Sequence, residues 1–323
     1  MGSQAGSSGW AVDADGDWAE TANWDAGVPG ASASIGNADV ATFAYALTVA
    51  RTVTVDAGRN IGGLVFAGAS ANAYTLAGGS LLLSSGGWIR NEADVGGRED
   101  VIAAPIVIQG DPGALTLRAN ATSLVSRLRI GAVAGSATAG NTTTLTLSGD
   151  FWNTENEVAG VIGDGAGGGK LAVVKSGITN TWVLGGANTF SGGVVVQEGI
   201  LVAENDTALG SGPVALSVGA GLALRGGVTV SGKTLVLTGG TPSTFGSLDS
   251  FGATNEWKGD VVFTNATPRL NVASGKLIIA GNVAVTHLTG NSTLGGFGDG
   301  EIRGVISGPS TKTLFRSSAD TGT

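Results

Sequence analysis

Short apolar runs separated by turn residues constrain the fold of this chain more than any other feature. Between Gly169 and Leu216, runs of Val, Leu, Ile and Trp alternate with clusters of Gly, Asn, Ser and Thr. The runs are residues 171–174, 182–184, 194–196, 200–202 and 214–216. Runs of this length, punctuated by turn residues, are typical of many short strands, and no helical period of 3.6 residues persists in this stretch. The stretch therefore predicts consecutive β-strands.

The same pattern extends along most of the chain. In the first half we expect strands at residues 52–55, 63–66, 74–76, 80–83, 106–108, 115–117, 128–130 and 144–147. In the second half we expect them at residues 222–224, 228–230, 235–237, 261–263, 270–272, 277–279 and 283–285. Alternation such as Thr52-Val-Thr-Val55 places one apolar face inward and one hydroxyl face outward.

A series of motifs gives the central stretch a family resemblance. The motifs are Lys175-Ser-Gly, Thr181-Trp-Val-Leu184, Gly186-Ala-Asn-Thr-Phe-Ser-Gly-Gly193, Glu198-Gly-Ile-Leu201 and Ala208-Leu-Gly-Ser-Gly-Pro213. Together they resemble the autotransporter-associated β-strand repeat (passenger-associated transport repeat) of bacterial surface proteins, with departures at Ile178-Thr-Asn180 and at Val194. The resemblance implies a right-handed parallel β-helix within an exported passenger or adhesin-like protein.

Composition supports one repetitive solenoid. Gly makes up 57 of 323 residues, but Pro is only 7 and the glycines lack a three-residue period, which excludes collagen. The Val and Leu runs supply enough apolar area to offset the entropy of ordering. Composition and strand pattern predict an all-β fold of many short strands, and the resemblance implies that they form a right-handed parallel β-helix (β-solenoid). At one strand spacing per coil it would have about ten coils and a length of ~50 Å.

The predicted organisation has three parts. Residues 1–9 are expected to be a flexible or added leader, and residues 10–45, rich in Trp and Asp, an irregular N-terminal cap, because a solenoid must close its apolar end. Residues 46–323 are expected to form the coils. Gly304-Val-Ile-Ser307 echoes Gly160-Val-Ile-Gly163, so the last coil is expected to be truncated at the C-terminus.

Charge and targeting patterns limit the partners. The net charge is −8 and the 17 Lys and Arg residues are dispersed, so nucleic acid and an anionic membrane surface are not expected to bind. The chain has no Cys and no apolar run long enough to span a bilayer. An extracellular or cell-surface location, as the resemblance implies, therefore requires a signal peptide and anchor outside these residues.

The strongest metal candidate is Asp13-Ala-Asp-Gly-Asp17. Asp13, Asp15 and Asp17 have the spacing that opens a calcium loop, but its twelfth position is Trp24 instead of Glu. The alternative is a polar turn, and the sequence leaves the two open. No metal ion or other cofactor is assigned.

Catalytic candidates are sparse. Paired acids occur at Glu92/Asp94, Glu99/Asp100 and Glu155/Glu157, and the last pair would share one face of an extended strand, with no basic residue close by in the sequence. His287 is the only histidine. The Gly-rich loop at residues 163–169 lacks the Gly-Lys-Ser/Thr ending and the following helix of a phosphate loop. No catalytic residue is therefore assigned, and the chain is predicted not to be an enzyme.

Tryptophans raise a separate hypothesis of glycan binding. Trp10, Trp18 and Trp24 could form a stacking platform in the cap, whereas Trp182 belongs to a strand and is expected to pack on a neighbouring coil.

The resemblance predicts that the chain is a non-enzymatic structural or adhesive segment of a surface protein, acting as a stalk or passenger. Its expected partners are further copies of itself, other surface proteins or glycans. The alternative is a polysaccharide-active enzyme or carbohydrate-binding module on the same scaffold.

Overall fold

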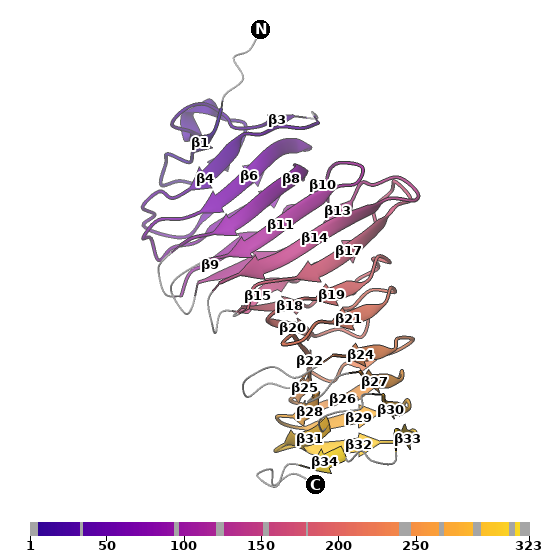
Figure 1. Cartoon of the computed structure of the whole chain (residues 1–323). Helices are drawn as coiled ribbons and strands as arrows, with labels where there is room; N and C mark the ends of the chain where they lie inside the picture. Colours follow the sequence, from indigo (N-terminus) through magenta and orange to yellow (C-terminus); the bar gives the residue numbers. More distant parts are fainter. Residues whose placement is uncertain are drawn as a thin grey trace. The chain divides into compact units, whose positions relative to one another are not determined.

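The computed structural model describes most of the chain (Figure 1). The described residues are 6–32, 35–93, 97–120, 126–150, 155–178, 180–238, 247–264, 268–286, 292–309 and 314–316. The chain divides into two compact units, Met1–Val173 with Thr189–Gly192, and Val174–Asn188 with Gly193–Thr323. Within the described ranges the only helix is the short 3-10 helix η1 (Thr21–Asn23).

The first unit contains two sheets. The first sheet holds β1 (Ser8–Gly9), β3 (Ala31–Ser32), β4 (Val40–Phe43), β6 (Arg59–Phe66), β8 (Leu81–Asn91), β10 (Ile106–Ile108), β11 (Ala114–Ala119), β13 (Val133–Gly135), β14 (Thr142–Gly149), β16 (Ile162–Gly163) and β17 (Lys170–Lys175), whose last two residues fall in the second unit. The second sheet holds β2 (Gly16–Asp17), β5 (Arg51–Val55), β7 (Tyr74–Gly78), β9 (Glu99–Ile102), β12 (Arg127–Ile130) and β15 (Glu155–Val158).

Parallel pairing stacks equivalent positions of successive coils in this unit, with one register shift between β6 and β8 at Ile61/Gly63 and one antiparallel pair, β3 with β6. Val53, Leu76, Ile102, Ile130 and Val158 are consecutive partners through the second sheet, and all five are fully buried. In the first sheet, the column Leu64, Ile89, Leu117 and Leu147 is buried in the same way. Because every second residue points inward, each strand adds one layer to a continuous apolar core.

The second unit contains three sets of strands. The first is β19 (Val194–Val196), β21 (Val214–Leu216), β24 (Leu235–Leu237), β27 (Val261–Phe263), β30 (Val283–Val285) and β33 (Ile306–Ser307). The second is β18 (Thr181–Leu184), β20 (Ile200–Ala203), β22 (Gly221–Arg225), β25 (Leu248–Phe251), β28 (Arg269–Val272), β31 (Ser292–Gly296) and β34 (Leu314–Arg316). The third is β23 (Thr229–Val230), β26 (Thr254–Trp257), β29 (Lys276–Ile279) and β32 (Asp299–Ile302).

Inward columns also run through the second unit. Trp182, Leu201, Leu222, Leu248 and Leu270 are consecutive partners, and each is buried. Trp182 thus packs in the core beside the neighbouring coil, as predicted from its place in a strand. The core of this unit is therefore a stack of equivalent layers, as in the first.

Glycine is required where one coil turns directly above another. Gly259, Gly281 and Gly304 hold equivalent positions, and a Cβ on Gly281 or on Gly304 would lie 2.2 Å from the carbonyl oxygen of the preceding glycine in this series. Any side chain would push the coils beyond the ~4.8 Å strand spacing that their hydrogen bonds need. Part of the high glycine content is therefore a consequence of stacking.

Aromatic side chains fill the N-terminal end of the first unit's core. Phe43 lies 5.7 Å from Trp18, 5.8 Å from Trp24 and 5.4 Å from Phe66 between ring centroids. The backbone next to β1 turns back on itself, since Asp25 donates its N–H to the carbonyl of Gly9 and Trp24 forms an antiparallel bridge with Trp10. This reversal interrupts the parallel ladder at that edge. The cap boundaries at residues 10 and 45 remain a prediction.

The predicted fold class is confirmed. The protein is all-β, and its parallel sheets stack as a β-solenoid of about 10 turns. Every strand expected from the sequence pattern overlaps a strand of the structure, and most bounds agree within two residues. The exceptions are β6, which begins at Arg59 instead of residue 63, and β8, which extends to Asn91 instead of residue 83. The pattern was readable because inward and outward residues alternate within each short run.

We predict that whole coils can be removed while partial coils cannot. Val261 and Val283 hold the same place in β27 and β30, so deleting residues 261–282 joins equivalent positions. The shortened chain should keep its β-sheet circular dichroism, with a midpoint of thermal unfolding within about 5 °C of the parent, because coils interact mainly with their neighbours.

Deleting only residues 261–271 is the matched control. This deletion shifts the following strands out of register and should abolish cooperative unfolding. Equal behaviour of the two deletions would contradict the assignment of the coil.

Candidate functional site

The three aspartates proposed for calcium do not converge. Asp13 accepts hydrogen bonds from Thr48 Oγ1 at 2.6 Å and Arg51 Nε at 2.8 Å, and Arg51, followed by Thr48, lowers the pKa of Asp13. Asp15 accepts the backbone N–H of Thr52 at 2.7 Å. Within the described ranges no group of three or more Asp, Glu, His or Cys side chains could hold a metal. Asp13 and Asp15 instead tie the N-terminal segment to the start of β5.

The acidic pair Glu155/Glu157 lies on β15, and one expectation about it is wrong. Both residues lie on the same face of the strand, as predicted, while Asn156 and Val158 between and after them are buried. However, a basic residue does accompany them, since Arg129 on β12 is in register with Glu157 and its Nε lies 3.1 Å from Glu157 Oε2. The sequence analysis missed this contact because Arg129 and Glu157 are far apart in the sequence and lie on strands of different coils.

The remaining acid pairs do not form a site among the described residues. Glu92 lies 3.9 Å from Arg90 in a loose ion pair. Glu99 and Asp100 are consecutive in β9, and Glu99 is exposed whereas Asp100 is buried. Asp94 and His287 lie outside the described residues.

The tryptophan platform is also a wrong prediction. Trp10, Trp18 and Trp24 are buried with 2%, 0% and 5% of their surface exposed. Trp18 Nε1 donates to the carbonyl of Pro29 at 3.0 Å, and Trp24 Nε1 donates to the carbonyl of Trp18 at 2.7 Å. Their rings pack against one another in edge-on and tilted contacts inside the core and cannot stack on a sugar. The preference of large aromatic rings for burial outweighs the polar composition of this segment.

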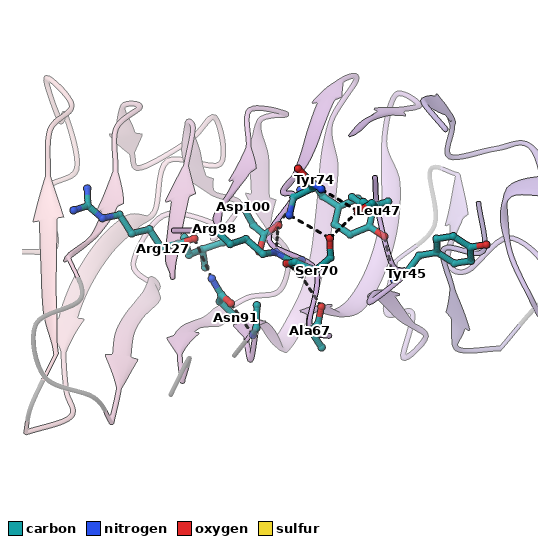
Figure 2. A network of polar contacts seen from close by, with 12 residues as sticks. Tyr45, Leu47, Ala67, Ser70, Tyr74, Asn91, Arg98, Asp100 and Arg127 are labelled. Carbon is teal, nitrogen blue, oxygen red and sulfur yellow. Dashed lines mark hydrogen bonds and ion pairs between the residues drawn. The ribbon is translucent and has the colours of Figure 1, made fainter. Parts of the chain in front are cut away.

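A polar cluster in the first unit is centred on a buried ion pair, Arg98 and Asp100, that the sequence analysis did not single out (Figure 2). Arg98 Nε lies 2.8 Å from Asp100 Oδ2 and 3.0 Å from Asp100 Oδ1, and both side chains are fully buried. Arg98 Nη1 donates to the carbonyl of Ala67 at 2.9 Å, and Tyr74 donates its backbone N–H to Asp100 at 2.9 Å. The guanidinium also lies 5.5 Å from the ring centroid of Tyr74.

Neighbouring groups extend this cluster across several coils. The hydroxyl of Tyr74 accepts the N–H of Tyr45 at 3.1 Å, and Asn91 Nδ2 donates to the carbonyl of Arg127 at 3.0 Å (Figure 2). Burial raises the pKa of Tyr74 to about 12, and burial also raises the pKa of Asp100 to about 6 against the lowering effect of Arg98. Since solvent and substrate cannot reach the pair, its role is to fasten loops of successive coils together.

A second buried cation stands at the end of β17. Lys175 is fully buried, and its Nζ donates to the carbonyls of Ser176 at 2.8 Å, Gly177 at 3.0 Å and Glu198 at 3.1 Å. The carboxylate of Glu198 accepts the N–H of Gly177 at 3.1 Å. The lysine therefore closes the turn after β17 against the turn that follows β19.

The alternation of inward and outward residues along β17 already indicates that Lys175 is buried. Leu171, Val173 and Lys175 are spaced by two and share the inward face, so the strand pattern itself carries the lysine inward. Arg98 and Asp100 have the same spacing and are both buried. A charged residue in phase with buried apolar positions is the sequence signal that could have identified these groups.

Comparisons with known proteins do not relate this chain to a family or to a characterised protein. No protein family, curated protein or solved structure matches the chain. In the part of the chain that the structure describes, no helix is long and apolar enough to cross a membrane.

We predict that the Arg98–Asp100 pair is coupled. Asp100→Leu leaves Arg98 buried without a counterion, and Arg98→Met leaves the carboxylate unpaired, so each should lower the free energy of unfolding by about 3 kcal/mol. The double variant Arg98→Met/Asp100→Leu should lose less than the sum of the two, measured by urea denaturation.

The exposed pair Arg90 and Glu92 is the matched control. Arg90→Met/Glu92→Leu should change stability by no more than about 1 kcal/mol. Additive losses at Arg98 and Asp100 would show that the two side chains act independently.

We predict a pH-dependent contribution from Lys175. Burial lowers its pKa from 10.5 to about 7, with Glu198 opposing the shift. Between those pH values the unfolded chain binds a proton that the folded chain has released, so stability should rise with pH from about 7 to 10, by on the order of 4 kcal/mol at most.

Denaturation midpoints of wild type and Lys175→Met, compared across this pH range, test the prediction. The difference between the two proteins should shift in favour of wild type as pH rises and should be constant below about pH 6. Lys170→Met, on the exposed face of the same strand, should parallel wild type at every pH. A constant difference for Lys175→Met would overturn the expectation.

Proposed function

We propose that the chain is a non-enzymatic structural or adhesive segment of an exported bacterial surface protein, a rigid β-solenoid stalk or passenger that self-associates or contacts other surface proteins. The observation that carries the proposal is the continuity of the stacked columns, such as Val53 to Val158 in the first unit and Trp182 to Leu270 in the second. Stacked coils resist bending because each strand is bonded to its neighbours along the ladder.

Buried polar groups support a mechanical role. Asn255 is fully buried, and its Oδ1 accepts the N–H groups of Gly227 at 3.0 Å and Val228 at 2.9 Å, while its Nδ2 donates to Ser250 Oγ at 2.9 Å. Like Lys175 and Arg98, this side chain is committed to holding turns. Groups engaged in this way strengthen the scaffold and are not free for chemistry.

The surface location rests on the repeat-like motifs between Lys175 and Pro213. Their resemblance to the autotransporter-associated β-strand repeat is the support for export, and the absence of cysteine is compatible with passage through an export route. Residues 186–193 form no strand and lie between β18 and β19, which agrees with a turn at that place in the motif.

The enzymatic and carbohydrate-binding alternatives lack support from the residues that suggested them. Glu157 is paired with Arg129, and Trp10, Trp18 and Trp24 are buried. We therefore retain the structural role as the proposal.

Surface exposure in the source bacterium is the decisive test. Antibodies raised against this segment should label intact cells, and protease added to intact cells should remove the label. An antibody against a cytoplasmic protein of the same cells should label only after permeabilisation. Labelling of the segment only after permeabilisation would overturn the proposed location.

A further inference from the structure

We draw no further inference here: the strongest candidate, the outward-facing stripe of Val195, Ala215, Val236, Val262 and Ala284 that runs in register across β19, β21, β24, β27 and β30, is an exposed to half-buried apolar sheet face, and nothing among the described residues shows what would cover it.

Discussion

This structure depends on one constraint: after each coil, the next strand must pair in register with the equivalent strand of the coil before it. An inward residue is buried only if the strands before and after it present inward residues at the same height, as Val53, Leu76 and Ile102 do. A shift by one residue would turn a whole strand's apolar face to solvent. Turn length can vary between coils, as the 20 to 26 residues between members of one column show, provided that the strand returns in phase.

The turns between strands maintain this register in two ways, through glycines and through buried polar side chains. Glycines such as Gly281 and Gly304 allow carbonyl oxygens of adjacent coils to approach where a Cβ would collide. Buried polar side chains such as Lys175 and Asn255 bond to the carbonyls and N–H groups that the turns leave without strand partners. Since an unpaired buried polar group costs about 1–3 kcal/mol, these side chains are needed wherever a turn is enclosed.

The first unit closes its apolar core at the N-terminal edge. At the N-terminal edge of the first unit, Trp10, Trp18 and Trp24 cover Phe43 and the backbone reverses direction. These aromatic rings therefore close the apolar core where the stacked columns begin.

The sequence by itself determined the all-β class and the positions of 20 of the 34 strands in the described residues, because alternation within short runs is a local property. The sequence also contains the signal for the inward position of Lys175, because Lys175 follows Leu171 and Val173 at a spacing of two residues and therefore shares their inward face. Only the tertiary structure decided which groups meet across coils. Arg129 reaches Glu157, Arg51 reaches Asp13, and three tryptophans with polar neighbours are buried together. These contacts depend on how many residues each turn consumes, and turn length sets the register between strands without leaving a periodic signal in the sequence.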